Sequence, residues 1–97
     1  KVKIKTPLFY PNPFQIGSQD LILGFGLTQP ATVKVYMFNH IGALVWTHEE
    51  TFSTIDYQEI TINSLDSFLR SGMYICKLIA EDDNGNKDIA TTKLVIY

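Results

Sequence analysis

The chain has 97 residues, of which 45% are apolar and 12% aromatic, and its formal net charge is −2. This length fits one domain spanning residues 1–97, and the composition is typical of a folded globular protein rather than a disordered segment. The 8 basic and 10 acidic residues are spread along the chain. Nucleic acid is therefore not an expected partner, because phosphate binding needs clustered positive charge. No segment has the length or charge pattern expected for direct membrane insertion.

The single cysteine and the N-terminal sequence carry two further expectations. Cys76 has no partner for an internal disulfide, and its alternating strand context predicts a small buried side chain. The chain begins at Lys1 without a signal-peptide pattern. We therefore expect it to be a piece of a longer protein.

A period of two, typical of half-buried strands, dominates from the N-terminus onward. Val2 and Ile4 alternate with lysines and predict the first strand. Leu21–Leu27 is the second, in which Gly24 and Gly26 leave one face bare for a ring or another backbone.

The middle of the chain reads as a hairpin. Residues 33–38 predict a third strand and residues 43–47 a fourth, joined by a turn over residues 39–42. Asn and Gly tolerate the positive φ that such a turn requires. Both faces of the third strand are apolar, which indicates either a central strand or a patch that meets a partner.

Three more strands follow. Residues 58–62 predict the fifth, 73–80 the sixth and 87–97 the seventh, with the clearest turn of the chain at residues 82–86. The loop over residues 63–71 is expected to hold one short helical turn. Seven short strands in about 100 residues predict an all-β, seven-stranded antiparallel sandwich.

One face of each strand must be buried, and the alternation selects the core. The predicted core residues are Leu21, Leu23, Phe25, Val33, Val35, Met37, Leu44, Trp46, Ile60, Ile62, Leu65, Tyr74, Cys76, Leu78, Leu94 and Ile96. Phe68 and Leu69 are also expected to point inward from the loop.

The sequence shows no convincing nucleophile with a base, carboxylate pair or metal cluster, so neither an enzyme activity nor a cofactor is expected of this domain. His48 beside Glu49 and Glu50 suggests a metal site, but a solvated strand end is the preferred interpretation. The acidic stretch 81–86 has some features of a calcium loop, yet it lacks the bidentate glutamate of an EF-hand. It is better explained as a hairpin tip.

Two prolines flank Asn12 in the segment from Tyr10 to Phe14. Each fixes its own φ and removes an amide donor, which predicts a stiff elbow outside any sheet. The elbow either carries the chain from one sheet to the next, with Phe14 or Tyr10 tucked beneath it, or is a rigid surface feature that a receptor reads.

Four blocks in this order resemble the C-terminal sorting domain of proteins exported by the type IX secretion system of Bacteroidetes. The residues that match its motifs are Pro11, Asn12, Pro13, Gly42, Gly72, Tyr74, Lys77, Lys93, Leu94, Val95, Ile96 and Tyr97. The resemblance covers nearly the whole chain, and the last block stands at its end.

The resemblance implies an immunoglobulin-like sandwich that serves as an export address for its parent protein. The implied partners are the outer-membrane translocon and shuttle, the sortase complex and the parent's upstream domains. The implied location is the cell surface, reached through the periplasm, with the domain either cleaved or retained. The acidic tip 81–88 and Phe14 are more typical of a sister group, the immunoglobulin-like accessory domains related to flagellar hook-capping proteins.

Two other functions remain open. The chain could be a passive accessory module that packs on a neighbouring domain, as continuation well beyond Tyr97 would indicate. It could also be an adhesive or carbohydrate-binding sandwich, which requires Tyr36, Trp46 or Tyr57 to share one exposed face.

If the secretion machinery recognises the terminal strand directly, trimming residues 94–97 should abolish export. An excised sandwich can also pair through its strand edges or exchange a strand.

Overall fold

The computed structural model describes residues 1–97 and contains seven β-strands. The strands are β1 (Ile4–Tyr10), β2 (Leu21–Leu27), β3 (Ala31–Asn39), β4 (Leu44–Phe52), β5 (Asp56–Ile62), β6 (Gly72–Glu81) and β7 (Lys87–Ile96). The second strand has the predicted bounds, and the others match the predictions to within a few residues except β1 and β4. The chain has no helix with the length and hydropathy that crossing a bilayer requires.

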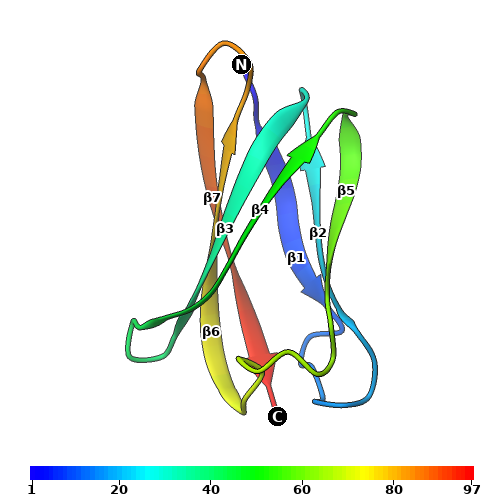
Figure 1. Cartoon of the computed structure of the whole chain (residues 1–97), viewed down its shortest axis with the longest axis vertical. Helices are drawn as coiled ribbons and strands as arrows, with labels where there is room; N and C mark the ends of the chain where they lie inside the picture. The colour runs from blue at the N-terminus through cyan, green and yellow to red at the C-terminus, as the bar shows by residue number, and fades with distance from the viewer.

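The strands form two packed antiparallel sheets. The first has the order β1-β2-β5 and the second the order β4-β3-β6-β7. Figure 1 shows the N-terminus beside the β6–β7 turn at one end of the sandwich, and the C-terminus at the other end near the β1–β2 connection. The predicted immunoglobulin-like β-sandwich is confirmed.

The core lies between the sheets and consists of the inward faces of both. Val33, Val35 and Met37 of β3 are fully buried, which settles the face of that strand. Cys76 is buried among them, as predicted. Val2, Phe9 and Phe52 are core residues that the prediction did not include.

Two predicted core residues are wrong. Leu44 is 51% exposed because the β3–β4 register shifts between Met37 and Phe38, so that Leu44 lies opposite Phe38 on the outer face. Leu65 is 85% exposed because it lies in a turn, where the Asn63 side chain accepts its N–H. Trp46 is partly buried and packs against the core.

The loop before β6 also differs from the prediction. It holds two consecutive reverse turns instead of a helical turn, closed by Asp66 N–H to Asn63 C=O at 3.0 Å and Leu69 N–H to Asp66 C=O at 3.1 Å. Phe68 and Leu69 are buried as predicted. The β4 strand runs to Phe52, well beyond its predicted end, so His48 lies within a strand rather than at its end.

Candidate functional site

The predicted elbow and the predicted terminal strand lie side by side, although about 80 residues separate them. The Asn12 Nδ2 donates to the Lys93 C=O at 3.1 Å, and the Val95 N–H donates to Asn12 Oδ1 at 3.0 Å. A single carboxamide thus satisfies a donor and an acceptor on the outer edge of β7, as a neighbouring strand would. Both the Tyr10–Pro11 and the Asn12–Pro13 bonds are cis.

Phe14 continues this contact with its backbone. Its N–H donates to the Val95 C=O at 2.8 Å, and the Tyr97 N–H donates to the Phe14 C=O at 3.0 Å. The result is a short parallel bridge between Phe14 and Ile96, with the Phe14 ring fully buried. Phe14 therefore reaches the edge of the four-stranded sheet with its ring buried, as one interpretation predicted. The predicted passage from one sheet to the next is wrong, because the chain returns to β2, which pairs with β1 in the same sheet.

The last strand alternates between core and surface. Leu94 and Ile96 are buried, whereas the Lys93 and Tyr97 side chains are exposed and Val95 is partly exposed. Of the terminal block, only these last three therefore present side chains that another molecule could contact.

Tyr74 stands opposite Leu94 on β6, and its role is structural. It is 5% exposed, and its hydroxyl donates to the Arg70 C=O at 2.7 Å. Its ring also meets Phe68 edge-on at 6.3 Å. A buried tyrosine at the start of this strand, bonded to the backbone upstream, is the tyrosine corner of immunoglobulin-like sandwiches. The Gly72–Tyr74 block is thus explained by the fold.

The remaining predicted motif residues lie apart from the elbow. Lys77 is on the outer face of β6, opposite Tyr36 and Thr91. Gly42 has φ 83° in the β3–β4 turn, where its N–H donates to the Asn39 C=O at 3.0 Å. That hairpin joins the two strands farthest from β7 in the sheet (Figure 1). The structure therefore brings the first and last blocks together, with Gly72 and Tyr74 beside them, but not Gly42.

The histidine and acidic residues considered as a metal site do not converge. His48 Nε2 lies 2.9 Å from Glu50 Oε1, and the His48 ring stacks on Trp46 with centroids 5.5 Å apart. Glu49 lies opposite Lys34 in the register of β3 and β4, on the other face of the strand from His48. No group of three or more His, Cys, Asp or Glu side chains is close enough to hold a metal ion.

The acidic hairpin tip is organised around Asp82. Its carboxylate accepts the N–H groups of Asn84, Asn86 and Val2 at 3.0, 2.9 and 3.3 Å, and the Asn86 Nδ2 at 3.2 Å. Desolvation acts to raise the pKa of Asp82, but the hydrogen bonds from Asn86, Asn84 and Val2 outweigh it and lower the pKa. These donors occupy the carboxylate, which supports the hairpin-tip interpretation of this segment.

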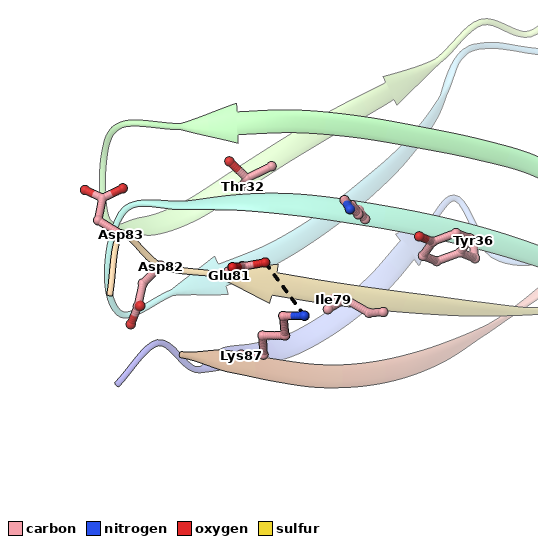
Figure 2. A pocket seen from close by; sticks show the side chains of 8 residues that line it. Thr32, Tyr36, Ile79, Glu81, Asp82, Asp83 and Lys87 are labelled. Atoms are coloured by element: carbon pink, nitrogen blue, oxygen red, sulfur yellow. Dashed lines mark ion pairs between the residues drawn. The ribbon is translucent and has the colours of Figure 1, made fainter. Parts of the chain in front are cut away.

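A groove of about 450 Å³ lies beside this tip on the outer face of the four-stranded sheet. Figure 2 shows Thr32 and Tyr36 along one side and Glu81 pointing toward Lys87, with Nζ 3.9 Å from Oε1. Lys34 and Asp83 complete a lining in which both charge signs are mixed. Such a lining does not select an anion or a cation.

The three aromatic residues proposed for a sugar platform do not share a face. Tyr36 lies on the outer face of the four-stranded sheet, whereas Trp46 packs against core residue Phe68 with centroids 5.4 Å apart. Tyr57 belongs to the three-stranded sheet, where sequence reasoning missed its partner Tyr10. The two hydroxyls are 2.5 Å apart, and both lie within hydrogen-bonding distance of the Glu59 carboxylate. The sequence did contain one signal for this contact, since Gly24 was predicted to leave a face open to a ring, and the Tyr57 ring lies over Gly24.

Comparisons with known proteins identify the fold alone. No family model and no curated protein matches the chain. Two solved structures of a β-glucuronidase from Parabacteroides merdae resemble it, with TM-scores of 0.62 and 0.63 and sequence identities of 12% and 13%. The matches cover 98% of this chain but only 14% and 13% of the β-glucuronidase chains. The chain thus spans about one seventh of the length of these proteins.

Proposed function

We propose that this domain is the C-terminal sorting signal that directs its parent protein through the type IX system to the cell surface. The observation that best supports the proposal is the Asn12 carboxamide on the edge of β7. It joins the first and last blocks of the motif resemblance through two hydrogen bonds, to Lys93 and Val95. Two blocks that act as one address need to be held together, and these hydrogen bonds hold them.

In this function the domain acts by recognition, with no reaction of its own. Pro13, Lys93 and Tyr97 all have exposed side chains. The hydrogen bonds of Asn12 and Phe14 to β7 place them at the same end of the sandwich. The translocon or shuttle would contact the surface at this end, and the stiff elbow would present it without a large ordering cost. The sortase then removes the domain, or the domain is retained as in a component of the secretion machinery.

A fusion tests the proposal. The 97 residues are attached behind a periplasmic fluorescent reporter in a bacterium that has the type IX system. We expect the reporter at the cell surface, and its mass separates a cleaved address from a retained one. Reporter that stays in the periplasm, while the fused domain is folded, contradicts the proposal.

Trimming residues 94–97 is not a suitable test of direct recognition. Leu94 and Ile96 are core residues, so that deletion removes part of the fold together with the surface. Substitutions that leave the core intact separate the two effects. Lys93→Ala and Tyr97→Ala alter only exposed side chains, and Thr61→Ala on the opposite sheet is the matched control.

Asn12 is tested with two variants. Asn12→Ala removes both hydrogen bonds to β7, whereas Asn12→Asp keeps the acceptor for the Val95 N–H and loses the donor to the Lys93 C=O. We expect reduced export for Asn12→Ala and a smaller reduction for Asn12→Asp. Circular dichroism of each purified domain confirms that the sandwich is intact. Normal export of a folded Asn12→Ala domain would show that the hydrogen bonds between Asn12 and β7 have no role in export.

An accessory module is the second candidate, and one observation favours it. On the outer face of the four-stranded sheet, Leu44, Phe38 and Ile75 form a continuous cross-strand row. Leu44 and Ile75 are 51% and 43% exposed, and Met73 on the same face is 60% exposed. Apolar patches of this kind commonly meet another surface, and a neighbouring domain of the parent is the natural one. In that case Ile75→Lys should destabilise the parent protein and leave the isolated domain unaffected.

A further inference from the structure

We propose that the outer face of the three-stranded sheet binds a neutral carbohydrate, with a pyranose ring stacked on Tyr57 at the groove lined by Gly26. This site is independent of the proposed address, because it lies on the other sheet of the sandwich (Figure 1). It rests on the placement of Tyr57, on the groove beside that ring and on the polar groups that line the groove.

The Tyr57 ring lies along the sheet surface rather than standing out from it. It starts on β5, and its hydroxyl reaches across β2 to within 2.5 Å of the Tyr10 hydroxyl on β1. A Cβ at Gly24 would be only 2.4 Å from the Tyr57 hydroxyl, so the close approach requires glycine at that position. A hydrogen-bonded cluster of the two tyrosine hydroxyls and the Glu59 carboxylate fixes the arrangement.

This fixed ring remains open to solvent. Tyr57 is 57% exposed although three strands contribute to holding it. A rigid exposed aromatic ring is a preorganised contact, because little side-chain freedom remains to be lost when a ligand binds. A tyrosine that served only the fold would be covered further.

A groove of about 490 Å³ adjoins the ring. Gly26 lies on its floor, between Lys5 on β1 and Tyr57 on β5, in one cross-strand row. Neighbouring strands are about 4.8 Å apart, so β1 and β5 stand roughly 9.5 Å apart across the glycine. Because Gly26 has no side chain, the surface between Lys5 and Tyr57 is open at this point.

The backbone on both sides of the groove is held in unusual conformations. Thr6 has φ 42° and Asp56 has φ 70°, and both line the groove. Positive φ is uncommon in non-glycine residues and rare in a β-branched one. The register shift in β1 between Lys5 and Leu8 belongs to the same feature. Bulges and strained residues of this kind often re-aim side chains toward a ligand.

The lining indicates the class of ligand. Thr6 supplies a hydroxyl, Asp56 a carboxylate and Lys5 an ammonium group, so the two formal charges in the groove cancel. The Thr28 hydroxyl is already hydrogen-bonded to the backbone of Lys1 and Lys3. A pyranose has an apolar C–H face for the negative face of the tyrosine ring, and hydroxyls for carboxylate and hydroxyl partners. A neutral sugar matches this combination better than a charged one. A proline-rich peptide would use the aromatic ring but would leave most of these polar groups unpaired.

The test is a titration of the isotope-labelled 97-residue protein, followed by heteronuclear NMR. The probes are oligosaccharides of β-glucose, β-xylose and α-mannose, each at millimolar concentration, and one proline-rich peptide. We expect at least one oligosaccharide to shift the amide signals of residues 24–27 and 55–58. If no oligosaccharide shifts these signals, or only the peptide does, the proposal is wrong.

Three variants then test the mechanism. Tyr57→Ala should weaken binding about tenfold, from the loss of one aromatic contact, and Tyr57→Phe should retain most of it. Gly24→Ala should act like Tyr57→Ala, because its Cβ displaces the ring while Tyr57 itself remains. Tyr36→Ala on the other sheet is the matched control. Unchanged binding by both Tyr57→Ala and Gly24→Ala would overturn the proposal, and the export assay of the address is unaffected by either outcome.

Discussion

Asp82 shows how one side chain organises a whole turn and fastens the N-terminus to it. Four N–H donors from Asn84, Asn86 and Val2 converge on its carboxylate, and its own N–H donates to the Asn86 C=O at 3.0 Å. These bonds favour the charged form, so the pKa of Asp82 is lower in the folded protein than in the unfolded chain. A lowered folded-state pKa contributes stability above the unfolded pKa, and that contribution is lost as the pH falls through the folded value.

The first prediction follows from this linkage. Asp82→Asn should lower the melting temperature at pH 7, because the amide lacks the charge and one acceptor oxygen. The difference between wild type and variant should begin to shrink as the pH falls below about 4, where Asp82 of the unfolded chain takes up a proton. It should disappear as the pH falls through the lower pKa of Asp82 in the folded protein. Thermal melts followed by circular dichroism across this range measure it. Equal melting temperatures at pH 7 would contradict the role assigned to the carboxylate.

The second prediction concerns the thiol. Burial raises the pKa of Cys76 to about 12, so the native protein holds almost no thiolate near neutral pH. A thiol reagent at pH 8 should therefore label Cys76 only when the core opens. Labelling followed by mass spectrometry should be slow in buffer and rapid in concentrated urea, where the same cysteine is exposed. Fast labelling of the native protein would show that the sheets separate readily at this point.

Some residue-level facts were beyond sequence reasoning for a physical reason. Leu44 and Leu65 are as apolar as their buried counterparts, and only a register shift and a local turn put them outside. Asn12 gave no sign of its partner, because its hydrogen bonds reach residues 81 and 83 positions away. Cys76, by contrast, was predictable from its own strand alternation.

At the scale of elements, β7 contributes more than an exposed end. It pairs with β6 along its length, buries Leu94 and Ile96, and accepts the bridge from Phe14. Removing a buried Leu or Ile side chain typically costs about 2–5 kcal/mol. Two such losses approach the whole stability of a small domain, which is about 5–15 kcal/mol.

The third prediction is that deletion of residues 94–97 unfolds the domain. The shortened protein should show no cooperative transition in urea, as followed by circular dichroism. Tyr97→Ala is the control, since that side chain is 65% exposed and its removal should cost less than about 1 kcal/mol. A shortened protein that still unfolds cooperatively would show that β6 and Phe14 hold this end without the last strand.

The elements themselves were largely predictable because each strand carries its own alternation and each turn its own residues. The turn at Asn39–Gly42 and the tip around Asp82 were predicted from residues whose hydrogen bonds are local. The extent of β4 was not, because His48, Glu49 and Glu50 lack the apolar alternation of a strand and are held there by pairing with β3. Within the candidate site, the elbow was predictable from its prolines, but its contact with β7 depends on tertiary structure.

At the scale of the whole molecule, the two sheets share one core, and neither could be stable alone. The apolar face of β1-β2-β5 is covered by the other sheet, and Phe25 on β2 meets Phe52 on β4 edge-on at 5.5 Å. Separating the sheets would expose nearly every buried apolar residue at once. Small domains with a single core of this kind usually unfold in one step.

The fourth prediction is therefore a single cooperative transition. The fluorescence of Trp46, the sole tryptophan, reports on the contact between β4 and Phe68, whereas far-UV circular dichroism reports on all strands. Urea titrations followed by the two probes should coincide. A fluorescence change that precedes the loss of strand signal would show that the β4 edge detaches as an independent unit.

The parallel bridge between Phe14 and Ile96 joins two residues that are synthesised at different times. A ribosome makes Phe14 long before it makes Ile96, and throughout that interval the elbow has no edge to rest on. The contact between the elbow and the edge of β7 can form only after β7 has been synthesised. A receptor that recognises this arrangement would consequently ignore prematurely terminated chains. The geometry of this end of the sandwich would then report that translation had passed β7.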